Sequence, residues 1–350
     1  MTIQHFWILN IVLFLGQLLL LLVLAWRKKI IQKKEHDMNH QYQQLLDPFS
    51  SYMIDSTDDQ FLKELRMSPY QSMVLERLLN GFVSVTKNSE CSPLVTQLSE
   101  EFLTNRYTKQ LTSRSWAIRM NTLYFIEDFH MKKLVPLLKE RLLKMTRLDQ
   151  EKQQLLRTLS SLGEPVTISI LEEHPEASVR LYIDLIKRLP LHTRVQQLDA
   201  VFFATNEHQH LKYAAISYIG MTGFRQYLPQ IELELQNEDE ETRIQALKAI
   251  LQMQQLSEPH MLIPFLHSSS WQERMFATRI VGKLQLSRFK EDLSKLLGDP
   301  IWWVRYSSAE AFAQFSDGDV MLTHLATSHP DRYARDMATQ WETSLLGSEQ

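Results

Sequence analysis

The sequence is poor in the residues that build disulfide-bonded and turn-rich proteins. It has one cysteine, Cys91, and 9 glycines in 350 residues. A single cysteine excludes an internal disulfide and suits a reducing compartment. Scarce glycine, with abundant leucine, glutamine, glutamate and lysine, favours helices, and no clear run of alternating strands is present. The composition predicts an all-α protein, long enough for one extended domain or two ordinary ones.

Charge is absent from residues 6–26, "FWILNIVLFLGQLLLLLVLAW". A helix of this length and apolarity can cross a bilayer. No basic residue precedes the stretch, and a basic cluster follows it, made of Arg27, Lys28, Lys29, Lys33 and Lys34. The positive-inside rule then predicts a single-pass membrane protein, with residues 1–5 outside and the rest of the chain in the cytoplasm.

A cleaved signal peptide is the other interpretation of this segment, with a weak cleavage site at Val23 and Ala25. The apolar run is too long for an ordinary signal core and lacks preceding cations, so a retained anchor is favoured. The basic cluster has two open interpretations, namely contact with anionic headgroups or a topology signal alone.

Positive charge is not in excess beyond that cluster. Without its five cations the chain keeps 33 basic and 41 acidic residues, a net charge of −8. Nucleic-acid binders carry a basic face, so the balance argues against a nucleic-acid partner.

A repeat of 31 residues is the strongest pattern in the chain. Three windows align without gaps: "DEETRIQALKAILQM" from Asp239, "SWQERMFATRIVGKL" from Ser270 and "IWWVRYSSAEAFAQF" from Ile301. One position of the unit is basic and forms what we call the basic ladder: Arg180, Lys212, Arg243, Arg274, Arg305 and Arg335. Small residues follow three positions later, at Ala246, Ala277 and Ser308, where they allow adjacent helices to approach closely.

A second amphipathic segment lies between the windows, as in "RQYLPQIELELQ" and "SRFKEDLSKLL". The unit is therefore helix, turn, helix, turn, and each unit buries its apolar face against its neighbours in an α-solenoid. We place the solenoid at residues 111–345, followed by a tail at 346–350. A polar juxtamembrane helix at 27–47, broken at Pro48, and a helical cap or degenerate repeats at 48–110 precede it.

These windows resemble the HEAT-like repeat family of the lyase type. "LLGDPIWWVRYSSAEAFAQF" is similar to its acid-capped turn, Val-Arg pair and small residues, and "KKLVPLLKERL" and "HMLIPFLHSS", with Pro136 and Pro264, are similar to its second helix. The resemblance implies an α-solenoid that binds other macromolecules. It also implies that ladder arginines bond to the capping acid of a neighbouring turn, a structural role.

Signatures of catalysis are missing. Related repeat hydroxylases use His-Glu pairs, and this chain has no such dipeptide and no phosphate-binding glycine loop. His36 and His40 have a spacing that can bind zinc, but Asp37 stands where the metalloprotease motif has glutamate and no third ligand is evident. We expect a solvated helix face there, with no catalytic residue, metal or cofactor.

Paired tryptophans open one repeat, at Trp302 and Trp303. Neighbouring helical side chains point about 100° apart, so one apolar stripe cannot easily bury both. Trp271 and Trp302 each lie three residues before the ladder arginine of their repeat, and Trp303 and Tyr333 each lie two before it, so we expect the last repeats to bring the four together. The two interpretations are packing beneath neighbouring loops and an exposed partner-binding patch.

The sequence therefore predicts a membrane-tethered cytoplasmic scaffold that binds a protein partner, such as a membrane enzyme or transport assembly. An enzyme on the same solenoid, lyase- or hydroxylase-like with an unrecognised site, is the alternative.

Overall fold

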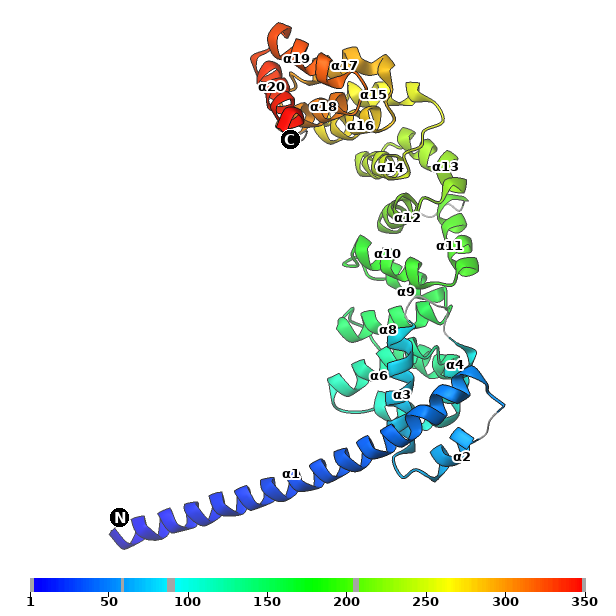
Figure 1. Ribbon diagram of the computed structural model, residues 1–350, viewed down its shortest axis with the longest axis vertical. Helices are drawn as coiled ribbons and strands as arrows, with labels where there is room; N and C mark the ends of the chain where they lie inside the picture. Colours follow the sequence, from blue (N-terminus) through cyan, green and yellow to red (C-terminus); the bar gives the residue numbers. More distant parts are fainter. Residues whose placement is uncertain (1–2, 58–59, 87–91, 204–207, 348–350) are drawn as a thin grey trace. The chain divides into compact units, whose positions relative to one another are not determined.

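The computed structural model describes the backbone of residues 3–57, 60–86, 92–203 and 208–347, and most side chains between 14 and 342 (Figure 1). This part of the chain is helical and contains no strand, which confirms the all-α prediction. It forms two compact units, residues 1–162 and 163–350. Cys91 lies outside the described residues.

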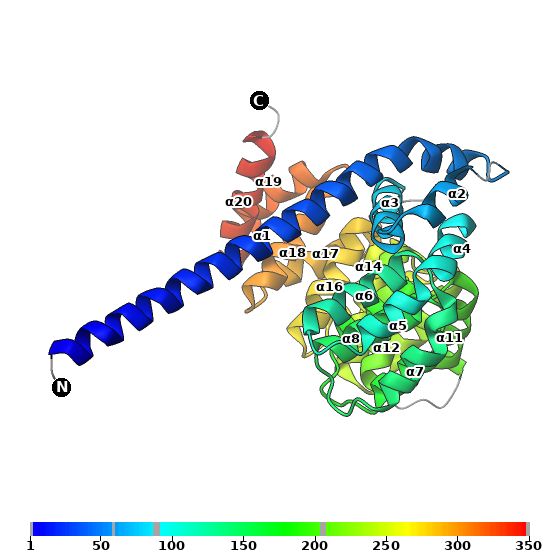
Figure 2. The ribbon, with the colours of Figure 1, turned by 90° about the horizontal axis from the view of Figure 1, so that it is seen from below.

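Unit 1 is built from helices that pack in chain order. They are α1 (Ile3–Ile54), α2 (Gln60–Met67), α3 (Gln71–Val85), α4 (Pro93–Phe102), α5 (Thr104–Leu111), α6 (Trp116–Asp128), the 3-10 turn η1 (Lys132–Leu134), α7 (Val135–Leu143) and α8 (Gln150–Ser161). The end of α1 packs on α2 and α3, and both α6 and α7 pack on α8. The first half of α1 extends away from the other helices of this unit, as the two views in Figures 1 and 2 agree.

The membrane anchor and the localisation predicted from the sequence are wrong on this structure. Among the residues described, no helix combines the length and the apolar character that a bilayer span requires. Residues 1–13, which hold the predicted tail and the start of the predicted span, lie outside the described side chains.

Pro48 does not break the first helix, contrary to the prediction. Helix α1 continues past it to Ile54. The residues around Pro48 are anchored by packing, since Phe49 contacts Phe61 at 5.4 Å and Phe82 at 6.1 Å between ring centroids. Tertiary contacts here outweigh the roughly 3 kcal/mol that an interior proline costs a helix. The predicted boundaries at residues 47, 110 and 345 otherwise stay predictions.

Unit 2 alternates two sets of helices, which we call first and second helices. The first helices are α10 (Val179–Arg188), α12 (Gln209–Thr222), α14 (Glu240–Met253), α16 (Trp271–Lys283), α18 (Trp302–Ala313) and α20 (Arg332–Gly347). The second set is α9 (Val166–Glu172), α11 (Leu191–Phe203), α13 (Leu228–Leu233), α15 (Ile263–Leu266), α17 (Lys290–Leu296) and α19 (Gly318–Ser328). Short 3-10 turns join them at η2 (Arg225–Tyr227), η3 (Glu234–Gln236), η4 (Pro259–Leu262) and η5 (Ser287–Phe289). From α10 to α20 each first helix packs on the next first helix (Figure 1).

The 31-residue register is confirmed by where the first helices begin. Helices α14, α16 and α18 each begin at the second residue of one of the three aligned windows. Asp239 caps α14, since its Oδ2 accepts the Thr242 N–H at 2.7 Å. Ala246, Ala277 and Ser308 are fully buried at equivalent places, as predicted.

Very close helix contacts follow from the small residues. A Cβ on Gly220 would lie 2.7 Å from the Cα of Ala249, and one on Gly282 would lie 2.6 Å from the Cα of Ala311. Both pairs join successive first helices. The helices approach most closely at these glycines, because glycine has no side chain to hold them apart. The second segments match as well, with Ile231 and Leu293 both fully buried.

Replacing Ala277 by phenylalanine should overpack this stack. We expect Ala277→Phe to lower the free energy of unfolding by about 1–3 kcal/mol. Urea denaturation of the intact chain measures it, with Val320→Phe as the control because Val320 is exposed in α19. Equal stability of Ala277→Phe and the parent would contradict the observed packing.

A left-handed residue ends each first helix in three successive repeats. Gly223, Gln254 and Gln285 have φ of 66°, 51° and 52°, and they are spaced by the same register. A non-glycine residue pays about 1–2 kcal/mol in this conformation. We expect Gln254→Gly to raise the free energy of unfolding by about 0.5–1 kcal/mol, because part of the gain is offset by the unfolded-state freedom of glycine.

The reverse change at Gly223 is its matched control. A Cβ there would meet nothing within 4 Å, so Gly223→Ala tests the backbone alone and should destabilise by about 1 kcal/mol. Thermal denaturation of both variants measures the pair of effects. A destabilised Gln254→Gly variant would show that this turn is not left-handed.

Candidate partner-binding site

An aromatic cluster occupies the start of α18 and the facing helix α20. Trp302 and Trp303 are 42% and 52% exposed, and Tyr333 is 64% exposed. The Trp302 ring meets Trp303 edge-on at 4.7 Å and stacks on Tyr306 at 5.0 Å. Tyr306 in turn contacts Trp341 at 5.2 Å. We call these five residues, Trp302, Trp303, Tyr306, Tyr333 and Trp341, the aromatic cluster.

The turn before α18 holds this cluster in place. Buried Asp299 accepts the Ile301 N–H at 2.8 Å through Oδ1, which fixes the chain just before Trp302. The buried face of α18 is supplied by the small and apolar residues that follow, including Val304 and Phe312. The two indoles therefore lie at the start of α18 and are partly exposed to solvent.

The tryptophans that we expected to lie together do not all do so, because Trp302 and Trp303 touch and Trp271 stands apart. Trp271, at the equivalent position of α16, is half-buried and joins no ring contact among the described residues. Trp303 does not point away from Trp302, as the helical spacing suggested, because the two rings touch. Trp116 has the same place before Arg119 in unit 1 and is a lone exposed indole, 49% exposed.

Sequence reasoning missed Tyr306 and Trp341. Tyr306 lies four residues after Trp302, a spacing that brings helical side chains together, so this signal was available. Trp341 comes from the last helix, which packs on α18 and α19. No repeat spacing indicates that contact.

The basic ladder ties each repeat to its neighbours. In Arg243 the Nη1 group donates to the Asn237 carbonyl of its own turn at 2.9 Å, while Nε donates to Glu273 of the next repeat at 2.6 Å. Arg274 repeats the pattern, with Nη1 on the Ser268 carbonyl and a two-pronged pair to Asp299 at 2.7 and 3.0 Å. Both guanidinium groups thereby stabilise their own turn and link their repeat to the next one.

The other members of the ladder differ. Lys212 pairs with Glu234 at 3.2 Å. Arg305 and Arg335 bond to carbonyls of their own turns, at 2.7 Å each, and to no carboxylate of the described chain. Arg180 is exposed and forms no ion pair with a described residue.

An unpredicted member of the same pattern lies in unit 1. Arg119 of α6 donates through Nη1 to the Ser113 carbonyl at 2.7 Å and through Nη2 to Glu151 of α8 at 2.7 Å. Arg141 of α7 also donates to Glu151 and to the Leu111 carbonyl. Burial works to raise the pKa of Glu151, but the two guanidinium groups outweigh it and hold this pKa below its ordinary value.

A half-buried ion pair lies between α3 and α5. Glu76 and Arg106 approach at 3.4 Å beside the buried ring of Tyr107. Burial raises the pKa of Glu76 even though Arg106 and Tyr107 act against it, and burial with the Glu76 charge raises the pKa of Tyr107. None of the three lines either pocket described next.

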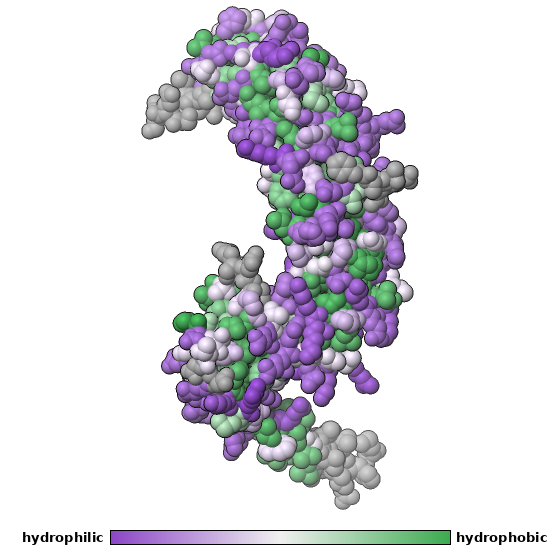
Figure 3. All heavy atoms as spheres, turned by 90° about the vertical axis from the view of Figure 1, so that its right-hand side faces the viewer, coloured by the Kyte–Doolittle hydropathy of each residue, from purple (hydrophilic) through white to green (hydrophobic). Residues whose placement is uncertain are grey.

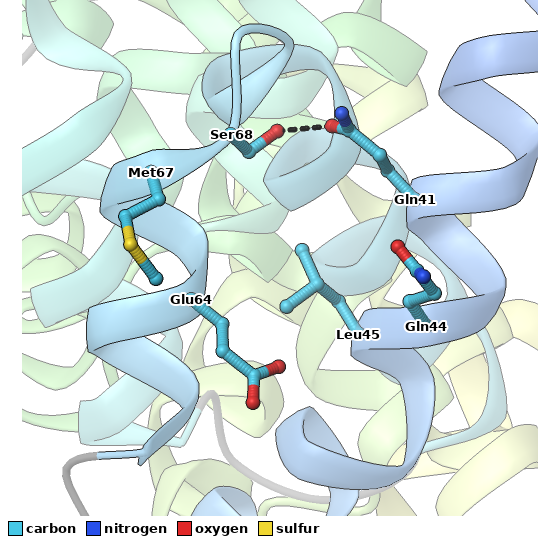
Figure 4. Close-up of a pocket in the computed structure, with 6 residues that line it drawn as sticks. All are labelled: Gln41, Gln44, Leu45, Glu64, Met67 and Ser68. Carbon is cyan, nitrogen blue, oxygen red and sulfur yellow. Dashed lines mark hydrogen bonds between the residues drawn. The ribbon is translucent and has the colours of Figure 1, made fainter.

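Two shallow pockets adjoin the second half of α1. One of about 450 Å³ lies against α2 and is lined by Gln41, Gln44, Leu45, Glu64, Met67 and Ser68 (Figure 4). The other, of about 470 Å³, is lined by His36, Asp37, His40, Gln41, Gln44, Pro69 and Tyr70. In the part of the chain that the structure describes, no three His, Cys, Asp or Glu side chains are grouped to hold a metal.

The basic cluster precedes the pocket residues in α1 and lines neither pocket. Arg27, Lys28, Lys29, Lys33 and Lys34 are exposed. The apolar residues before them are exposed as well, and hydrophobic residues of α1 are visible at the foot of Figure 3.

Comparisons with known proteins complete these observations. No protein-family model and no curated protein matches the chain. Among solved structures the chain is similar to an engineered protein, with 14% identity over 88% of this chain and 92% of that chain and a TM-score of 0.37. It is also similar to the complex of CpcE and CpcF of phycocyanin lyase from Nostoc sp. PCC7120, with 18% identity over 74% and 97% of the chains and a TM-score of 0.28. The helical-repeat fold is shown by the packing of this chain's own helices.

Proposed function

We propose that the chain is a helical-repeat scaffold that binds a protein partner through the aromatic cluster of its last repeats. The observation that carries the proposal is the exposure of Trp302 and Trp303 as touching rings at the start of α18, with the exposed ring of Tyr333 against Arg305 of the same helix. Exposed tryptophan and tyrosine are the side chains that most often dominate binding energy at protein interfaces. Contiguous exposed apolar surface of this kind marks interaction sites rather than ordinary surface.

The charge of the chain supports a protein over a nucleic acid as the partner. Outside the cations of 27–34 the net charge is −8, which disfavours a polyanion.

Binding rather than catalysis is the activity we propose. Each ladder arginine with a carboxylate partner serves a repeat junction, which is a structural use of charge. Glu76 and Tyr107, whose pKa values are raised, are packed within unit 1 and line neither described pocket. In the part of the chain that the structure describes, no arrangement of groups favours a lyase- or hydroxylase-like reaction over binding.

Photo-crosslinking in cells that make the chain tests this proposal. Trp303 is replaced by p-benzoylphenylalanine, and the control carries the same residue at Val320, which is exposed in α19. The expected result is a discrete covalent adduct with another protein from position 303 alone. Adducts of equal yield from both positions, or none from 303, would contradict the proposal.

A further inference from the structure

The ladder arginines of three repeats share one arrangement. Each uses Nη1 to hold the carbonyls of its own turn and its outer nitrogens to bind a carboxylate from a later helix or turn. The carboxylates are Glu151 for Arg119, Glu273 for Arg243 and Asp299 for Arg274, with shortest distances of 2.7, 2.6 and 2.7 Å. The geometry shows that this place in the repeat accepts an Asp or Glu side chain.

Arg305 keeps the inner half of this arrangement and lacks the outer half. Its Nη1 donates to the Asp299 carbonyl at 2.7 Å and the Pro300 carbonyl at 3.1 Å, as in the preceding repeats. No carboxylate of the described chain bonds to it. The acid of the following turn, Asp331, instead accepts the Ala334 N–H at 2.9 Å at the start of α20.

The side chain that faces Arg305 is aromatic. The Tyr333 ring lies 5.2 Å from the guanidinium carbon, within the range of a cation–π contact. Such a contact leaves the in-plane N–H groups of Nε and Nη2 able to donate. Trp302 and Trp303 come just before Arg305 in α18, so an unpaired cation lies among the exposed rings.

We infer that the partner segment bound by the aromatic cluster carries an Asp or Glu side chain that pairs with Arg305. This inference rests on the proposed function and names the chemistry of the partner. The partner carboxylate takes the place that Glu273 and Asp299 take in the preceding repeats, and an adjacent apolar side chain of the partner covers Trp302 and Trp303. Guanidinium and carboxylate match in a two-pronged geometry, so the pair selects an acidic residue and fixes the segment's direction.

A displayed library of random 12-residue peptides, selected against the intact chain, tests this inference. The best peptide is made again with its acid replaced by the amide, and both forms are titrated by fluorescence anisotropy into the parent, Arg305→Met and Arg335→Met. Arg335 is the matched control, because its Nη1 makes the same bonds to its own turn, at 2.7 and 3.0 Å.

We expect acidic residues beside apolar ones in the selected peptides. The amide form should bind the parent and Arg335→Met at least about tenfold more weakly than the acid form, the effect of one charge-assisted pair. Arg305→Met should not distinguish the two forms. Equal losses in all three proteins, or selected peptides held by their C-terminal carboxylate, would overturn the inference.

The proposed function fails in a different way. If a Trp302→Ala, Trp303→Ala double variant bound the selected peptides as tightly as the parent, the aromatic cluster would not be the binding site. Peptides that need both tryptophans but show no preference for an acid would leave the proposed function standing and overturn only the pairing with Arg305.

Discussion

Replacing Glu151 by glutamine should destabilise the intact chain by about 3 kcal/mol. The carboxylate joins α6, α7 and α8, because it accepts hydrogen bonds from both Arg119 and Arg141 and its side chain is only 5% exposed. Glutamine keeps the shape but turns an NH₂ group toward one of the guanidinium groups. Removing one partner of a buried pair commonly costs about 3–5 kcal/mol, and the lower end applies here because both arginines keep some access to water.

This effect should depend on pH in a defined direction. The pKa of Glu151 is lower in the folded chain than its ordinary value of 4.5. A carboxyl group with a lowered folded-state pKa stabilises fully above its unfolded-state pKa and loses this contribution as the pH falls through its folded-state pKa. The stability difference between the parent and Glu151→Gln should therefore be largest near pH 7 and shrink below about pH 4.5.

Urea denaturation at pH 7 and at pH 3.5, followed by circular dichroism, measures both parts of this prediction. Glu140→Gln is the control, because Glu140 pairs with Lys144 at 2.6 Å on the exposed face of α7. That substitution should leave the free energy of unfolding nearly unchanged. A Glu151→Gln variant as stable as the parent at pH 7 would mean that the three helices are held together without this ion pair.

The repeat could be predicted from the sequence because its signals recur at a fixed interval. The helix starts, the buried Ala246 and Ala277, and the second-helix core residues all obey the 31-residue spacing. Each unit packs on its neighbours in the same way, so the same kind of residue is required at the same place. Even the left-handed turn residues follow the spacing, although only Gly223 gives a glycine signal.

Only some partners of the ladder arginines could be predicted. Asp299, which pairs with Arg274, is the turn acid that the resemblance implies, whereas Glu273, which pairs with Arg243, is not. Glu273 and Asp299 come from different parts of their repeats, one inside α16 and one in the turn before α18. A side chain as long as arginine reaches either position, so no sequence interval defines the contact. For the same reason, the sequence did not show that Arg305 has no carboxylate partner in the described chain.

The start of the chain shows where local pattern misled. A run of apolar residues followed by cations predicts a membrane span, but the described part of α1 does not meet the length and apolarity that a span requires. Pro48 predicts a helix end, but Leu45, Phe49 and Tyr52 are buried on either side of it. The error at Pro48 arises because local sequence carries no information about the tertiary contacts of the finished helix.

Removing the paired tryptophans should abolish partner binding with little loss of stability. Trp302 and Trp303 lie at the surface, and the main interaction that their removal takes from the folded chain is the stacking of Trp302 on Tyr306. An aromatic pair of this kind contributes about 0.5–1.5 kcal/mol. Truncating a central tryptophan of an interface costs more than about 2 kcal/mol of binding, which is roughly a thirtyfold loss of affinity.

Trp116→Ala is the matched control for this double variant. Trp116 has the same repeat position before Arg119, is similarly exposed, and has no ring contact with another described residue. A lone exposed indole should matter little to stability or to binding. The control therefore separates the effect of the cluster from the effect of losing any surface tryptophan.

The most direct test of the central claim is a binding titration with the partner captured from position 303. Its affinity is measured for the parent, for Trp116→Ala and for the Trp302→Ala, Trp303→Ala double variant. The account predicts parental affinity for Trp116→Ala and an affinity at least about thirtyfold weaker for the double variant, which still melts cooperatively within a few degrees of the parent. A double variant that binds as tightly as the parent, or one that no longer folds, would contradict the assignment of this cluster as the docking site.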